Sequence, residues 1–250
     1  MKSKKVLIVD NNDLTRKLIE SLIGQLCSFV SVKTSLKAVE QASAIKFDLI
    51  LMDLQLPGSD GISTQKKIRR QSAFLCPIIA ISTFSTDSTR ECLLESGFDE
   101  VITKPIRPKE LLDIISGKLT GKEEKNLEIA PQQEQEEVLN KKVLNQLLKY
   151  NTAETIKSIY LDFLVEYDEL MDKINPAFES KDQQSLIESL HTVKGNSGTL
   201  GCSAIFKLSS DADLHARAQD WKYLEEKLIK LKIERILLEK YIKEETTFIP

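Results

Sequence analysis

Four polar side chains in the first half of the chain follow or end apolar runs, and together they could handle a phosphate group. They are Asp10 after VLIV, Asp53 after LILM, Ser82 at the end of PIIAIS and Lys104 after VIT. Two carboxylates suit a hard cation such as Mg²⁺, which shares its oxygen ligands with phosphates, and a lysine with a hydroxyl suits an anionic ligand. Taken singly, each residue would be a turn residue, a cap or a solvated charge. Taken together, they predict phosphate chemistry.

A second candidate is the segment LHTVKGNSGTLG around His191, one of only two histidines in the chain. On a helix, Lys194, Gly195 and Gly198 would lie on the same side as this histidine. A glycine inside a helix costs about 1 kcal/mol relative to alanine, so two of them suggest that a bare surface is needed beside the imidazole. For an isolated histidine, an ordinary surface residue near a helix end would be the simpler interpretation.

The first candidate group needs a parallel sheet to bring it together. Between residues 5 and 118, five apolar runs alternate with segments of helical periodicity at 13–26, 36–46, 61–71, 86–96 and 108–118. This alternation predicts an α/β domain, a doubly wound five-stranded parallel sheet with helices on both faces. Sites in such sheets form at the carboxyl ends of the strands, where the four polar residues stand.

The second half has no strand pattern. Residues 120–137 are rich in Glu, Gln and Lys and contain Pro131, which indicates a linker. Helical spacing follows at 139–149, 153–179, 183–200, 203–217 and 220–244, which predicts an all-α helical bundle. We therefore expect domains at 1–119 and 138–250. A stripe of residues on the His191 helix should face the bundle core: Leu186, Leu190, Val193, Ser197 and Leu200.

Bulk properties exclude several other classes. The 250 residues are 41% apolar with a net charge of −3, too near neutrality for a nucleic-acid-binding surface. The four cysteines lack Cys-x-x-Cys spacing, which argues against a zinc site, and His191 with His215 offers no ligand spacing either. Neither a signal-peptide core nor a membrane-spanning run is present. We expect a cytoplasmic protein without membrane insertion.

The first half closely resembles the receiver domains of response regulators, through VLIVDNN, DLILMDLQLPGSDGI, PIIAIS and ITKP over about residues 4–118. The resemblance implies a flavodoxin-like fold with Asp53 as phosphoacceptor. It also implies a Mg²⁺ site with Asp10 and Asn11 at the acidic-pair positions, Asp53, and the backbone carbonyl of Gln55. The chain departs from the family at Asn11, where an acidic residue is usual, so we expect weakened Mg²⁺ binding unless Asp13 compensates.

The same resemblance assigns the remaining polar residues. Ser82 would hydrogen-bond a phosphoryl oxygen, and Lys104 would pair with the phosphoryl charge and precede a cis bond to Pro105. Val101 stands where the family often has an aromatic residue that reports phosphorylation, so the usual aromatic output switch is in doubt.

The His191 segment resembles the His-x-x-Lys-Gly-x-Ser-x-x-Leu-Gly motif of histidine phosphotransfer (HPt) domains, more weakly over about 138–245. The resemblance implies that His191 is a phosphoacceptor and that Lys194 stabilises the phosphoryl charge, with Phe163 in the preceding helix. His215 has no lysine at i+3 and no nearby glycine, so we interpret it as a helix-surface residue.

These resemblances imply a phosphorelay protein that exchanges phosphoryl groups with a sensor histidine kinase, other receivers or HPt proteins. No P-loop or kinase-type glycine loop is present, so we expect a phosphotransfer intermediate rather than an ATP-dependent enzyme. Two alternatives stand beside it. One is a phosphohydrolase of the haloacid-dehalogenase type, which needs Asp-x-Asp where this chain has Asp10-Asn11-Asn12. The other is an HPt protein whose degenerate receiver serves as a regulatory docking module.

Overall fold

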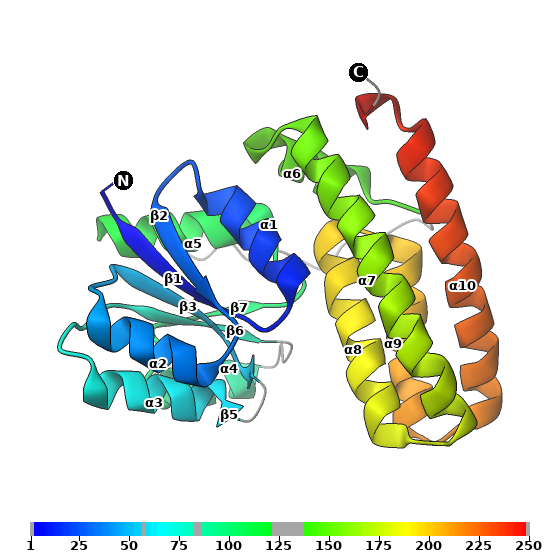
Figure 1. Cartoon of the computed structure of the whole chain (residues 1–250), viewed down its shortest axis with the longest axis horizontal. Coiled ribbons are helices and arrows are strands. Elements are labelled where there is room, and N and C mark those ends of the chain that lie inside the picture. Colours follow the sequence, from blue (N-terminus) through cyan, green and yellow to red (C-terminus); the bar gives the residue numbers. More distant parts are fainter. Residues whose placement is uncertain (1–2, 57–58, 83–86, 122–137, 249–250) are drawn as a thin grey trace. The chain divides into compact units, whose positions relative to one another are not determined.

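The computed structural model describes residues 3–56, 59–82, 87–121 and 138–248, which form two compact units, 1–128 and 129–250 (Figure 1). The division between the units falls inside the predicted linker, most of which lies outside the described residues. Helix α5 continues to Thr120, one residue into that segment. The predicted domain boundaries themselves stay a prediction.

The first unit alternates strands and helices as the apolar pattern predicts. Its elements are β1 (Lys5–Val9), α1 (Asp13–Ile23), β2 (Ser28–Val32), α2 (Ser35–Ala44), β3 (Leu49–Asp53), β4 (Gln55–Leu56), β5 (Ser59–Asp60), α3 (Gly61–Gln71), β6 (Ile78–Ser82), α4 (Asp87–Glu95), β7 (Glu100–Thr103) and α5 (Pro108–Thr120). The short β4–β5 hairpin is antiparallel. The other five strands form one parallel sheet in the order β2-β1-β3-β6-β7, so the predicted doubly wound fold is confirmed.

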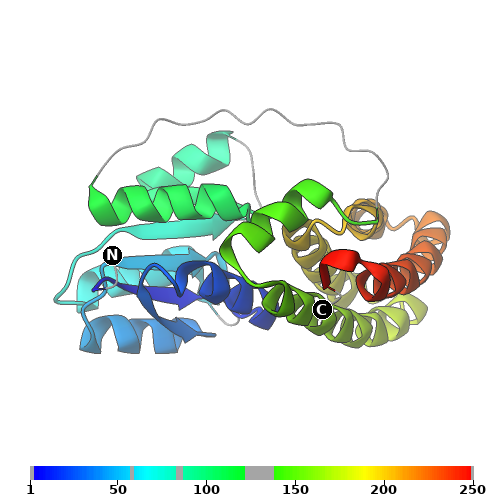
Figure 2. The same ribbon diagram turned by 90° about the horizontal axis from the view of Figure 1, so that it is seen from above.

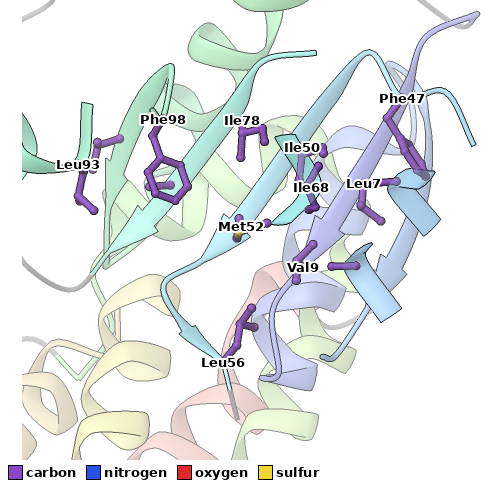
Figure 3. Close-up of a cluster of buried hydrophobic side chains, with 14 residues drawn as sticks. Leu7, Val9, Phe47, Ile50, Met52, Leu56, Ile68, Ile78, Leu93 and Phe98 are labelled. Atoms are coloured by element: carbon purple, nitrogen blue, oxygen red, sulfur yellow. The ribbon is translucent and has the colours of Figure 1, made fainter. Parts of the chain in front are cut away.

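Helices cover both faces of this sheet: α1 lies beside α5, and α2 packs beside α3 on the other face (Figures 1 and 2). The central strands are buried on both faces, which is why they read as continuous apolar runs. Figure 3 shows the core on the α2–α3 face, where Leu7 and Val9 of β1 lie beside their register partners Ile50 and Met52 of β3. The core holds the strands at a fixed register, and so fixes where each strand ends.

The second unit is entirely helical among its described residues. Its elements are α6 (Lys141–Tyr150), α7 (Ala153–Glu179), α8 (Gln183–Leu200), α9 (Ser203–Arg217), α10 (Trp221–Glu244) and the 3-10 turn η1 (Thr246–Phe248). The predicted stripe from Leu186 to Leu200 on α8 is buried throughout. Two buried tyrosines tie the helices together: the Tyr160 hydroxyl donates to the Leu200 carbonyl (2.8 Å), and the Tyr167 hydroxyl donates to the Leu231 carbonyl (2.9 Å).

The helices begin and end at residues that the chemistry of caps explains. The side chains of Thr152 and Asp182 accept hydrogen bonds from the Thr155 and Ser185 amides in the first turns of α7 and α8. Gly201 ends α8 in the left-handed conformation, with a φ of 72°. A Cβ at Gly201 would lie 2.7 Å from the Val143 Cβ of α6, so close packing also requires glycine there.

Candidate functional site

The parallel register gathers the four candidate residues of the first unit at one edge of the sheet, which we call the aspartate site. Val9 pairs with Met52, Asp53 with Ile81, and Ser82 with Thr103. Asp10 and Lys104 are the residues that follow β1 and β7. Because parallel strands end together, these four residues come from four adjacent strands although 94 positions separate Asp10 from Lys104 in the chain.

Lys104 joins the two carboxylates of the aspartate site. Its Nζ lies 2.7 Å from the Asp53 Oδ2 and 3.3 Å from the Asp10 Oδ2, and all three side chains are buried or nearly so. The Lys104–Pro105 peptide bond is cis, as the resemblance implies. The Lys104 amide donates to the Ser82 carbonyl (2.6 Å), which fixes Ser82 beside the lysine, and Ser82 is 1% exposed.

Backbone amides hold the other oxygen of each carboxylate. The Asn12 amide donates to the Asp10 Oδ1 (2.8 Å), and the Gln55 amide donates to the Asp53 Oδ1 (3.0 Å). Each carboxylate is thus oriented by its own loop and directs its second oxygen at Lys104. The arrangement is preorganised, because backbone amides and Lys104 hold the two oxygens of each carboxylate.

Burial shapes the electrostatics of this cluster. It raises the pKa of the Asp10 carboxyl from 3.8 to about 6, since the Lys104 charge lowers the pKa but does not cancel burial and the nearby Asp53 charge raises it further. Burial alone would lower the pKa of the Lys104 ammonium, yet the two carboxylates outweigh it and raise that pKa. Two carboxylates facing one ammonium leave an excess negative charge, which a cation would relieve.

Oxygen donors alone surround this excess charge, which fits a hard cation such as Mg²⁺. Asp10 and Asp53 supply the two carboxylates, exposed Asn11 follows Asp10 directly, and Gln55 begins the hairpin after Asp53. No cluster of three or more His, Cys, Asp or Glu side chains occurs in the described part of the chain. A cation here would therefore rely on two carboxylates, neutral oxygens and water.

Two residues that lie against the aspartate site were not identified from the sequence. Arg16 is buried, and its guanidinium donates to the Asp10 carbonyl (2.7 Å) and pairs with Asp13. The Asp13 carboxylate also meets the Lys33 Nζ at 2.8 Å, so two cations already neutralise it. Gly61 is the other neighbour: a Cβ there would lie 2.8 Å from the Asp53 carbonyl oxygen, so the backbone passes too close for any side chain. In the sequence, Arg16 is one of several charged residues on a predicted helix, so no pattern distinguishes it.

The helix beside β7 contacts the strand at Val101. Val101 is buried in β7, and the Arg90 guanidinium of α4 donates to its carbonyl (3.0 Å) while pairing with Glu100. The position where an aromatic residue is usual in receivers is thus closed by aliphatic packing and an arginine.

The second candidate, which we call the histidine face, lies on α8 and comprises His191, Lys194, Gly195 and Gly198. His191 and Lys194 are half-buried, one turn apart, on the side away from the buried stripe. A Cβ at Gly195 would meet nothing within 4 Å. Packing inside the chain therefore does not require this glycine, unlike Gly201.

Three further residues singled out in the second half of the sequence pack within the bundle or lie on its surface. Ser197 is fully buried and donates to the Lys194 carbonyl (3.1 Å) within the helix. Phe163 is buried on α7 and packs edge-on against Tyr167. His215 lies on α9, stacked on Tyr223, with its Nδ1 3.4 Å from Asp220, as a partly exposed helix residue.

Comparisons with known proteins match each unit separately. A family model for the response regulator receiver domain matches residues 6–116, and one for the Hpt domain matches residues 158–240. Sensor histidine kinase GacS of Pseudomonas protegens is 28% identical over 204 residues, which cover 78% of this chain and 22% of the relative. Signal transduction histidine-protein kinase BarA of Escherichia coli is 27% identical over 205 residues with the same coverage. The chain thus spans about a fifth of the length of these curated relatives.

Among solved structures, the receiver domain of a Pseudomonas aeruginosa sensor histidine kinase, described with a magnesium ion in its active-site cleft, is 28% identical. The match covers 47% of this chain and 98% of that one, with a TM-score of 0.41. None of the helices in the described residues has both the length and the apolar content needed to cross a membrane. The family matches and the confirmed sheet order lead to one conclusion: this chain contains a response regulator receiver domain followed by an Hpt domain, two modules of two-component phosphorelay signalling.

Proposed function

We propose that this protein is a reversible phosphoryl carrier that accepts a phosphoryl group on Asp53 and carries one on His191. The observation that carries the proposal is the contact of the Lys104 Nζ with both Asp53 and Asp10 at the sheet edge. A lysine held between two buried carboxylates is poised to meet the charge of a phosphoryl group. The location at the carboxyl ends of the strands is where doubly wound sheets bind their ligands.

The reaction at Asp53 is a displacement at phosphorus. An Asp53 carboxylate oxygen forms the new O–P bond as the P–N bond of a donor phosphohistidine breaks, and the donor imidazole leaves with the electron pair of that bond. The equatorial oxygens carry most of the charge during transfer, so catalysis depends on positioned positive charge and hydrogen-bond donors. Lys104 supplies the charge, and the Ser82 hydroxyl supplies a donor.

A divalent cation fits the remaining charge. Asp10, Asp53, the Asn11 amide oxygen and the Gln55 carbonyl are the oxygens of this chain that would hold Mg²⁺. When bound, Mg²⁺ would neutralise negative charge on the phosphoryl oxygens. The Asn12 and Gln55 amides keep the two carboxylates oriented while their charge is shared.

His191 would carry the phosphoryl group on the half-buried side of α8 that lies away from the buried stripe. Its imidazole can attack a phosphoaspartate of a receiver, so the reaction at Asp53 runs in reverse on the partner's residue. Lys194, one turn further along the helix, would pair with the phosphoryl charge. The open space beyond Gly195 gives a partner's site room to approach the ring.

The partners we propose are a sensor histidine kinase, other receivers and other Hpt proteins, as donors or acceptors. The curated relatives are sensor histidine kinases by name, which supports a kinase as the phosphoryl source. We also propose a cytoplasmic location, because the protein must share a compartment with the kinase that would donate its phosphoryl group.

A second candidate function is an Hpt protein whose receiver only docks and regulates. Asn11 offers a neutral oxygen where receivers usually have a carboxylate. Asp13 cannot readily replace it, because Arg16 and Lys33 already neutralise its charge. Weak cation binding would then leave Asp53 poorly phosphorylated.

One experiment separates the two functions. The full chain is incubated with a labelled, autophosphorylated histidine kinase, and the label is sorted into acid-labile phosphohistidine and phosphoaspartate. The carrier function predicts both species in the wild type, loss of phosphoaspartate in Asp53→Ala and loss of phosphohistidine in His191→Ala. Phosphohistidine in the wild type, with no phosphoaspartate in either the wild type or His191→Ala, would favour the docking function.

A further inference from the structure

Helix α10 presents an apolar stripe on the side that faces away from the bundle. Ile229, Ile233, Ile236 and Leu237 are 55%, 51%, 63% and 41% exposed. At 100° per residue they fall within one arc of about 100°. The other exposed large apolar side chains of the described helices stand singly or in pairs. Such a continuous stripe on a soluble helix is typical of an interaction surface.

This stripe is surplus to the packing of α10 inside its own chain. The opposite side of the helix already contributes a buried row against α7 and α9, namely Leu224, Leu228, Leu231, Leu238 and Ile242 (Figure 1). Arg235 fixes the rotation of the helix by pairing bidentately with Asp168 of α7, at 2.9 and 2.6 Å. The outward stripe therefore cannot turn inward to be buried.

Charged residues flank the stripe in an order that is self-complementary. Along the outward side, exposed Lys222 and Glu226 precede the apolar stripe and exposed Lys240 and Glu244 follow it. Lys230, at the edge of the stripe, pairs with Glu226 in the same chain (2.5 Å). If a second α10 lies antiparallel with Ile233 opposite Ile233, then Glu226 falls opposite Lys240 and Lys222 opposite Glu244. Ile229 then falls opposite Leu237. In a parallel pair, each charge would instead face its own copy and repel it.

The helix dipole supports the same arrangement. Lys222 lies in the first turn of α10 and Glu244 in its last, so each charge is at the unfavourable end of its own helix. An antiparallel neighbour reverses this, because Lys222 then meets the negative carboxyl end of the partner helix. Glu244 meets the positive amino end. Glu244 also meets the Lys240 ammonium of its own chain at 3.9 Å, and the antiparallel pair would give both end charges a favourable helix terminus as well.

We propose that the protein forms an antiparallel homodimer through the outward side of α10, with Ile233 on the twofold axis. Each of the flanking charges finds a partner of opposite sign in the second copy, and the apolar stripes of both copies leave water. A single helix pair is a small interface, so the dimer should be of modest affinity, on the order of micromolar. The histidine face is on α8, whereas α10 packs on α7 and α9, so the proposed contact does not use the helix that carries His191.

Charge reversal on the full chain tests both the contact and its direction. Sedimentation equilibrium should give a concentration-dependent dimer for the wild type. Glu226→Lys and Lys240→Glu should each weaken it at least tenfold, and the double variant Glu226→Lys/Lys240→Glu should restore it, because the swapped charges again face each other. Ile233→Lys should abolish it by placing two charges on the axis.

The controls keep each outcome decisive. Leu214→Lys removes an equally exposed apolar residue from α9 and should leave the dimer unchanged. Far-UV circular dichroism checks that α10 stays folded, and the substitutions at 226 and 240 still decide the question if Ile233→Lys does not fold. A monomeric wild type, a dimer that persists in Ile233→Lys, or a double variant no better than either single variant would overturn the proposal.

Discussion

The two candidate sites obtain their electrostatics in different ways. The aspartate site is built from buried charges that the sheet register forces together, and Lys104 contacts both Asp53 and Asp10. The histidine face is a half-buried imidazole on a helix, beside an open position at Gly195. We infer from this comparison that the receiver site assembles its own charged groups, whereas the histidine face offers a nucleophile and one nearby lysine and relies on a partner's site for the other groups.

Removal of Lys104 should have the largest effect on the receiver. Lys104→Met deletes the positive charge between two buried carboxylates, so phosphorylation of Asp53 should fall by about 10²–10³-fold. The receiver should lose roughly 3 kcal/mol of unfolding free energy, because two buried carboxylates remain uncompensated. Initial rates with a labelled phosphodonor measure the first effect. Lys194→Met on α8 is the matched control, and it should leave Asp53 labelling unchanged; an unaffected rate in Lys104→Met would refute the assigned role.

The raised pKa of Asp10 predicts an unusual dependence of stability on pH. Its carboxyl binds a proton more tightly in the folded chain, with a pKa of about 6 against 3.8. The stability of the receiver should therefore be greatest below pH 4 as far as Asp10 is concerned, and should fall as pH rises through 6, by up to about 3 kcal/mol. Asp10→Asn should remove this fall and stabilise the receiver at pH 7.

Asp48 provides a control of opposite sign in the same domain. Hydrogen bonds from Lys4 and Lys5 outweigh burial and hold its pKa below the ordinary value. Its contribution is present above the unfolded pKa and is lost as pH falls. Asp48→Asn should thus destabilise the receiver at pH 7. All five tyrosines and Trp221 lie after residue 149, so urea unfolding of the receiver must be followed by NMR signals of β1 and β3. An equal pH dependence in Asp10→Asn and wild type would contradict the account.

Asn11 tests how far the receiver side depends on a bound cation. Asn11→Asp should tighten Mg²⁺ binding by roughly tenfold, about 1.4 kcal/mol, because the cation holds its ligands mainly by charge. The third carboxylate should slightly lower stability without metal, and added Mg²⁺ should recover it. Calorimetric titration measures the affinities. Asp13→Ala should leave Mg²⁺ affinity nearly unchanged, since Asp13 already forms ion pairs with Arg16 and Lys33. A large loss of affinity would mean that Asp13 is a ligand.

Two glycines, Gly195 and Gly201, separate the effects of partner approach and of packing in the Hpt domain. Gly195→Leu should slow phosphotransfer with a receiver by blocking its approach, and Gly195→Ala should raise stability by about 1 kcal/mol, because its Cβ enters open space. Gly201→Ala should do the opposite: it should destabilise the bundle, since φ is 72° and Val143 is too close, without obstructing transfer. Trp221 fluorescence reports this unfolding. Undiminished transfer in Gly195→Leu would remove the docking explanation for the glycine.

Most of the fold follows from the sequence, because buried parallel strands and amphipathic helices have different periods. The five strands and the long helices lie where the periodicity predicts them, with helix ends shifted by up to three residues, as at Ile23. The β4–β5 hairpin and η1 were not predicted, because two or three residues are too few to show a period. The roles of Arg16 and Gly61 also required coordinates, since both depend on contacts with the backbone around Asp10 and Asp53.

The central claim, that only the receiver carries its own catalytic environment, is tested most directly with a small acyl phosphate as sole donor. The full chain, Asp53→Ala and His191→Ala are each incubated with labelled donor and Mg²⁺, without any partner protein. We predict that the wild type and His191→Ala acquire phosphoaspartate, whereas Asp53→Ala acquires no label, because His191 depends on a phosphorylated receiver for its phosphoryl group. Labelling of His191 in Asp53→Ala at a rate comparable to that of Asp53 in His191→Ala would contradict the account.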